Sequence, residues 1–88
     1  NEKSYVALGL AEEAGEVAGV VKRLMRKDAI SEEEFRRKLV KEMGDVLWYL
    51  AAVGWVFGVT LEEVARTNLA KLADRAERGV LKGSGDDR

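Results

Sequence analysis

The sequence of 88 residues contains no cysteine, no histidine and no proline. Without cysteine it cannot form a disulfide framework, a thiol nucleophile or a thiolate metal site, and this composition is usual in a reducing compartment such as the cytoplasm, where we expect the protein. Without histidine it lacks the commonest general base and the commonest ligand for zinc, copper and haem. Any catalysis must therefore depend on carboxylates, lysine, arginine, asparagine or a hydroxyl group.

The sequence also lacks a large excess of either charge and a long apolar run. Its net charge of −1 gives no general attraction to nucleic acid or to an anionic membrane. The longest apolar run, residues 46–59, is shorter than the roughly 20 residues that a membrane-spanning helix needs. The first residues are polar and acidic, unlike a signal peptide. We therefore expect no nucleic-acid partner and no membrane span.

Hydrophobic side chains recur at three- and four-residue steps, which predicts three helices in a single all-α domain spanning residues 1–88. The first helix is expected from Ser4 to Lys27 and ends near Asp28. Its apolar stripe contains Val6, Leu10, Ala14, Val17, Val21 and Leu24.

Two residue pairs have the pattern of a capping box, in which a hydroxyl and a carboxylate each satisfy a backbone N–H at a helix start. These pairs are Ser31 with Glu34 and Thr60 with Glu63. They open the second and third predicted helices, for which Gly58 and Gly79 are the expected stops. Residues 80–88 are predicted to form a mobile tail.

The second predicted helix is apolar on two sides. Its main stripe contains Phe35, Leu39, Met43, Val46, Leu50, Val53 and Phe57. Trp48, Ala51 and Trp55 lie roughly opposite this stripe at about 100° per residue. Because one small core cannot cover both sides, the sequence predicts a helical bundle completed by oligomerisation. The alternative is that the two tryptophans cover the core of a monomer.

Five glycines lie inside the predicted helices, where each costs about 1 kcal/mol relative to alanine. They are Gly9, Gly15, Gly19, Gly44 and Gly54. Close approach between helices is the commoner reason for such glycines, and room for a bulky ligand is the rarer one.

Carboxylates three residues apart occur on two of the predicted helices. They are Glu13 and Glu16, beside Glu12, on the first helix, and Glu42 and Asp45 on the second. This spacing places two side chains on one helix face, about 5 to 6 Å apart at Cβ, which suits two oxygen ligands of one cation. Oxygen ligands without nitrogen or sulfur favour Mg²⁺, or Mn²⁺, over zinc. A single acidic pair of this kind is also common on solvent-exposed helices.

The third predicted helix carries three anion-binding side chains at steps of three and four residues. They are Asn68, Lys71 and Arg75. Together with the carboxylates they are compatible with a phosphate-binding site and equally with a structural network of salt bridges. Spacing alone does not separate the two.

At these residues the sequence resembles the MazG-like family of all-α nucleoside triphosphate pyrophosphohydrolases, which are relatives of the dimeric dUTPases and the phosphoribosyl-ATP pyrophosphatases. The resemblance spans almost the whole chain. It consists of an EExxE motif at Glu12, Glu13 and Glu16, an ExxD motif at Glu42 and Asp45, and an NxxK motif at Asn68 and Lys71.

The resemblance implies Mg²⁺-dependent attack of water between the α- and β-phosphates, which releases a nucleoside monophosphate and pyrophosphate. The implied metal ligands are Glu13, Glu16, Glu42 and Asp45, and Glu12 is the implied residue that orients or deprotonates the water. Substrate contacts are expected from Asn68, Lys71, Arg75 and Lys22. The family also implies a dimer or a tetramer with sites at subunit interfaces, and a four-helix bundle whose fourth short helix must be formed by the tail or be missing.

Two alternatives remain open from the sequence. The first keeps the chemistry and changes the substrate to phosphoribosyl-ATP, although the Trp-Tyr-Leu that follows Asp45 lacks the Tyr-His usual in those enzymes. The second is a non-catalytic helical oligomerisation module whose acidic residues serve solubility.

Overall fold

The computed structural model describes residues 1–26 and 30–79, which form three helices and no strand. The helices are α1 (Glu2–Met25), α2 (Glu32–Phe57) and α3 (Leu61–Arg78). The all-α fold class is therefore confirmed. The predicted tail, and with it any fourth helix formed by residues 80–88, lies outside the described residues.

The ends of α2 and α3 follow local capping as the sequence predicts. The hydroxyl of Ser31 accepts a hydrogen bond from the backbone N–H of Glu34 at 3.0 Å, and the hydroxyl of Thr60 accepts one from Glu63 at 3.1 Å. Gly58 ends α2 in the left-handed backbone region with φ of 76°, which glycine adopts without steric cost. These caps fix both ends of α2, the helix that carries Glu42 and Asp45.

Helix α1 begins earlier than expected. It starts at Glu2 rather than Ser4, because the side chain of Asn1 accepts a hydrogen bond from the backbone N–H of Ser4 at 2.8 Å and so acts as the cap. Its last helical residue is Met25. The expected end near Asp28 lies outside the described residues.

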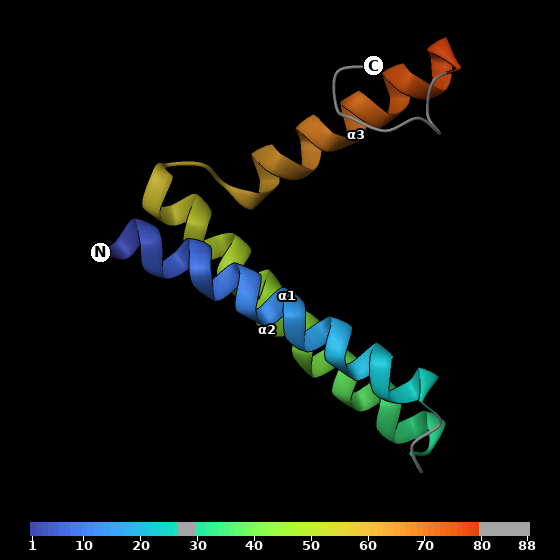
Figure 1. Ribbon diagram of the computed structural model, residues 1–88. Helices are drawn as coiled ribbons and strands as arrows, with labels where there is room; N and C mark the ends of the chain where they lie inside the picture. The colour runs from blue at the N-terminus through green and yellow to red at the C-terminus, as the bar shows by residue number, and fades with distance from the viewer. Residues whose placement is uncertain (27–29, 80–88) are drawn as a thin grey trace.

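Helices α1 and α2 lie side by side and antiparallel, and α3 leaves this hairpin at an angle (Figure 1). In the described part of the chain α3 contacts α2 but not α1. The overall dimensions of 44 × 39 × 19 Å describe an open, flattened shape rather than a sphere.

The hairpin has almost no core of its own. Among the described residues, Val6 and Val20 are the only buried hydrophobic side chains. Many large apolar side chains are exposed instead, including Met43 at 55%, Trp48 at 61% and Trp55 at 84%. So much uncovered apolar surface is unusual for a monomer, which is why we retain the expectation of an oligomer.

Two of the five helix glycines are sites of close approach. A Cβ atom on Gly9 would overlap the ring of Tyr49 on α2, and one on Gly54 would overlap the backbone carbonyl of Val59. The expectation that close approach between helices explains the glycines is therefore correct at Gly9, whereas the contact at Gly54 is with the backbone that follows α2. A Cβ atom on Gly15, Gly19 or Gly44 would meet nothing within 4 Å in this chain.

No single helix in the described ranges is long and apolar enough to cross a membrane. By length and composition, α2 and α3 together meet that requirement as a pair bent by 103°.

Candidate metal centre

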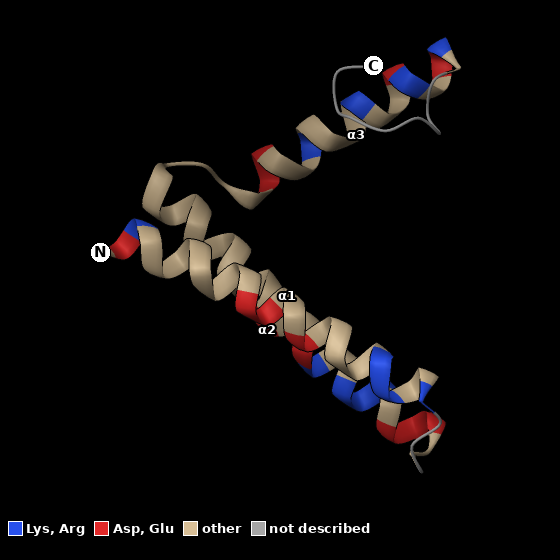
Figure 2. Cartoon of the chain, viewed as in Figure 1, with Lys and Arg blue, Asp and Glu red and all other residues tan. Residues whose placement is uncertain are grey.

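Three carboxylates from the two hairpin helices converge on one point. One oxygen each from Glu13, Glu42 and Asp45 lies within 4.8 Å of the other two, and all three residues are half-buried. We call these residues the acidic cluster. Figure 2 shows acidic stretches of α1 and α2 lying beside each other along the hairpin.

The local structure explains why these three side chains meet. Glu13 follows Gly9 by one helical turn on the side of α1 that packs against α2, where Gly9 admits the ring of Tyr49. Glu42 and Asp45 are three residues apart on α2, so they project from the same face, about two turns and one turn before Tyr49. The close approach of the helices at Gly9 therefore brings the acids of α1 and α2 together.

The electrostatics of the cluster are those of uncompensated negative charge. Partial burial raises the pKa of Glu13 above its ordinary value of 4.5, and the charges of Asp45, Glu12, Glu42 and Glu16 raise this pKa further. A cation placed between the carboxylates would relieve this repulsion.

The ion pairs within the described ranges do not include the acidic cluster. They join neighbours on a single helix, namely Arg37 with Glu34, Arg66 with Glu62 and Arg78 with Asp74. The structure therefore gives no support to the alternative in which Glu13, Glu42 and Asp45 serve a network of salt bridges.

The other two acids of the EExxE motif are more exposed. Glu12 lines a hollow of about 280 Å³ together with Tyr5, Leu8, Gly9 and Tyr49. Glu16 is exposed and is not among the three residues whose oxygens converge, although its charge contributes to the raised pKa of Glu13.

In the part of the chain that the structure describes, α3 does not bring its expected substrate-binding residues to the acids of α1. Asn68 and Lys71 line a hollow of about 550 Å³ that also includes Leu47 of α2. Because α3 does not contact α1 in the described part of the chain, these two side chains lie away from Glu13. Arg75 is buried on α3, and Lys22 is exposed in the last turn of α1.

Tyr49 is a residue of the site that the sequence did not identify. A hydrogen bond with Tyr5 raises the pKa of Tyr49, and burial and the charges of Tyr5, Glu13 and Glu12 raise it further. The phenol of Tyr49 thus lies close enough to Glu13 and Glu12 to respond to their charges. Its position four residues after Asp45, on the same helix face, was the available signal.

The stability of the metal-free protein is expected to fall as the pH rises from about 4.5 toward neutrality. The pKa of Glu13 is raised in the folded state, so the folded state binds more protons than the unfolded state in this window. Thermal unfolding in a chelating buffer, followed by circular dichroism across this range, measures the effect. Glu13→Gln should make the stability depend less on pH in this range. An unchanged dependence on pH would contradict the assignment of the effect to Glu13.

The donor set fits a hard divalent cation. Three carboxylates without nitrogen or sulfur suit Mg²⁺ or Mn²⁺. Partial burial and then the neighbouring negative charges raise the pKa of Glu13, and a bound cation would oppose the effect of those charges. Such a cation can bind a polyphosphate chain and lower the pKa of a bound water. The arrangement can therefore support hydrolysis of a phosphoanhydride.

Comparison with known proteins agrees with this chemistry. Residues 1–80 match the family model of the MazG nucleotide pyrophosphohydrolase domain, and no solved structure matches the chain. The chain is 48% identical over 86 residues to the Gene 37 protein of Mycobacterium phage L5, covering 97% of this chain and 75% of the phage protein. It is 38% identical over 80 residues to the uncharacterized protein YvdC of Bacillus subtilis (strain 168), covering 83% of this chain and 76% of YvdC. With a family match over all three described helices and acids gathered between two of them, the chain belongs to the MazG nucleotide pyrophosphohydrolase family.

Proposed function

We propose that the protein hydrolyses nucleoside triphosphates, with Mg²⁺, between the α- and β-phosphates to release a nucleoside monophosphate and pyrophosphate. The observation that carries this proposal is the acidic cluster, in which three oxygens from two helices lie within 4.8 Å of one another. Family membership supports a nucleotide substrate.

The acidic residues have distinct roles in this proposal. Glu13, Glu42 and Asp45 hold the cation, and Glu16, one turn after Glu12 and Glu13 on α1, adds a fourth carboxylate. When bound, Mg²⁺ neutralises phosphate charge and makes a coordinated water more acidic. Glu12 is exposed beside the cluster and orients the attacking water or accepts its proton.

Asn68 and Lys71 contact the substrate, with Lys71 on phosphate oxygens, and Arg75 and Lys22 add positive charge. Because α3 does not contact α1 in the described residues, we propose that a second copy of the chain completes the site. A groove of about 600 Å³ lined by Val17 of α1 and by Val40, Met43 and Leu50 of α2 gives the second copy an aliphatic surface to pack against.

The direct test is a pyrophosphate-release assay across the common ribonucleoside and deoxyribonucleoside triphosphates. We expect turnover with Mg²⁺ or Mn²⁺, no turnover in a chelating buffer, and a nucleoside monophosphate as the second product. Release of inorganic phosphate with a nucleoside diphosphate would contradict the site of cleavage. Absence of turnover on every nucleotide would favour a non-catalytic helical module.

A further inference from the structure

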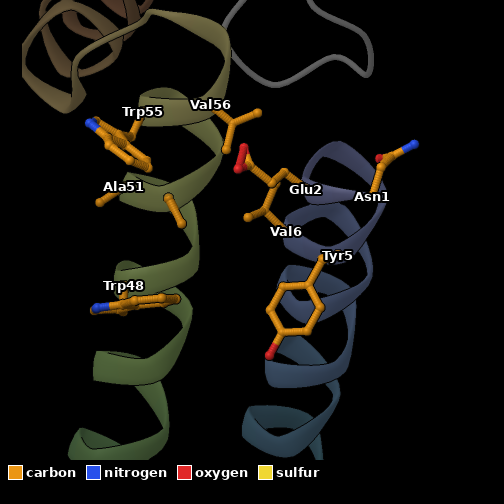
Figure 3. A pocket seen from close by; sticks show the side chains of 9 residues that line it. Asn1, Glu2, Tyr5, Val6, Trp48, Ala51, Trp55 and Val56 are labelled. Atoms are coloured by element: carbon orange, nitrogen blue, oxygen red, sulfur yellow. The ribbon is translucent and has the colours of Figure 1, made fainter.

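An open hollow of about 830 Å³ lies between the first turns of α1 and the C-terminal half of α2. Its lining includes Tyr5 and Val6 of α1 and Trp48, Ala52 and Trp55 of α2, and we call it the aromatic groove. Figure 3 shows the rings of Trp48 and Trp55 one above the other on α2, with the ring of Tyr5 on the α1 side. Aromatic walls of this kind suit a flat ring.

The aromatic groove adjoins the smaller hollow that contains Glu12 and Tyr49, and the charge of Glu13 in the acidic cluster acts on Tyr49. Tyr5 lines both this groove and the smaller hollow that contains Glu12 and Tyr49. The ring centroids of Tyr5 and Tyr49 are 6.4 Å apart, and those of Trp48 and Tyr49 are 5.0 Å apart in an edge-to-face arrangement. A series of aromatic rings therefore connects the groove to the acids.

Trp48 is the indole nearest to the acids along the helix. It follows Asp45 by three residues, which is about 4.5 Å along the helix axis, whereas Trp55 follows Asp45 by ten residues, or about 15 Å. The edge of Tyr49 supports the Trp48 ring, while 61% of Trp48 remains exposed. This ring is thus positioned beside the acids and is open to a stacking partner.

The distribution of charge along the hairpin favours one orientation of a bound nucleotide. There is no charged residue between Lys3 and Glu12 on α1, and none between Asp45 on α2 and Glu62 at the start of α3. The opposite end of the hairpin is rich in basic residues, as Figure 2 shows. A nucleotide has a flat base at one end and several negative charges at the other, so its base is favoured at the uncharged aromatic end.

We propose that the aromatic groove binds the nucleobase of the substrate, which stacks on Trp48 while the phosphates reach the acidic cluster. This inference rests on the proposed function. It also gives the two apolar sides of α2 different roles, because the tryptophan side receives the base and the side with Met43 and Leu50 packs against a second copy.

A kinetic experiment separates the base from the phosphates. For Trp48→Ala we expect the KM of the best nucleoside triphosphate to rise about 5- to 150-fold, the range for loss of one base-aromatic stack. Trp48→Phe should restore most of the loss. The inhibition constant of tripolyphosphate, which has no base, should stay within about twofold of wild type. Equal weakening of both ligands, or an unchanged KM, would overturn the proposal.

A binding experiment tests the groove without turnover and without metal. In Trp55→Phe, where Trp48 is the only indole, we expect nucleoside monophosphates to quench the tryptophan fluorescence saturably, and ribose 5-phosphate to leave it unchanged. When Glu42→Gln is added to Trp55→Phe, nucleoside monophosphates should still quench the fluorescence of Trp48. If the protein hydrolyses no nucleotide but quenching persists, the proposed function fails and the groove assignment stands. If hydrolysis occurs and no nucleoside monophosphate quenches the fluorescence of Trp48, the proposed function stands and the assignment of the aromatic groove to the base fails.

Discussion

Glu42→Gln is expected to lower kcat/KM for nucleoside triphosphates by about 10³-fold, because it removes one of three converging carboxylates that hold the cation. The amide has nearly the same shape as the carboxylate but no negative charge, so its coordination of Mg²⁺ is much weaker. Helix content should be unchanged, since Glu42 makes no ion pair within the described residues. Initial-rate measurements of pyrophosphate release and circular dichroism check the two statements.

The same variant distinguishes a metal site from a structural salt-bridge network. In a chelating buffer at neutral pH, Glu42→Gln should be at least as stable as wild type, because the substitution removes one of the negative charges that, after burial, raise the pKa of Glu13. Added Mg²⁺ should raise the thermal midpoint of wild type but not that of the variant. Glu33→Gln, the same change at an exposed position on α2, is the matched control and should leave activity unchanged. Marked destabilisation by Glu42→Gln with full metal-dependent activity would refute the assignment.

Gly9→Val is expected to lower the free energy of unfolding by about 2 kcal/mol, a typical cost of overpacking a close contact. Any Cβ atom at this position overlaps the ring of Tyr49, so the ring or the helix must move. Activity should fall as well, since this contact sets the distance between Glu13 on α1 and the acids of α2. Urea unfolding followed by circular dichroism gives the stability change.

Two controls test the cause of this effect. Gly15→Val places the same side chain at a position with no atom within 4 Å in this chain, and we expect a change of less than about 0.5 kcal/mol. In a Tyr49→Ala background, Gly9→Val should cost much less than in wild type, because the overlapping ring is gone. An equal cost in both backgrounds would show that the contact with Tyr49 is not the reason for Gly9.

The helix boundaries were predictable because they depend on neighbouring residues. Ser31, Thr60 and Gly58 act through hydrogen bonds and backbone angles within one turn. The start of α1 was placed two residues late because the cap formed by Asn1 was not recognised.

The acidic site was predictable only in part. The spacing of Glu42 and Asp45 on one helix correctly placed both on a shared face, and the structure brings Glu13 to them. The periodicity of α1 places Glu13 at the border of the apolar stripe, but it could not show how close Glu13 comes to Glu42 and Asp45, because that depends on how deeply the helices approach at Gly9. The contact between Gly9 and Tyr49 joins residues 40 positions apart, and no local pattern encodes it. For the same reason, the angle at which α3 leaves the hairpin could not be predicted from the sequence.

The central claim, that carboxylates of α1 and α2 together bind a divalent cation, is tested most directly by titrating the protein with Mn²⁺ and following the free ion by electron paramagnetic resonance. We expect wild type and Glu33→Gln to bind at least one ion per chain with equal affinity, and Glu13→Gln and Glu42→Gln each to bind at least about 10-fold more weakly. Weaker Mn²⁺ binding by both Glu13→Gln, on α1, and Glu42→Gln, on α2, would show that the two helices share one site. Equal Mn²⁺ binding by all four proteins, or none by wild type, would contradict the account.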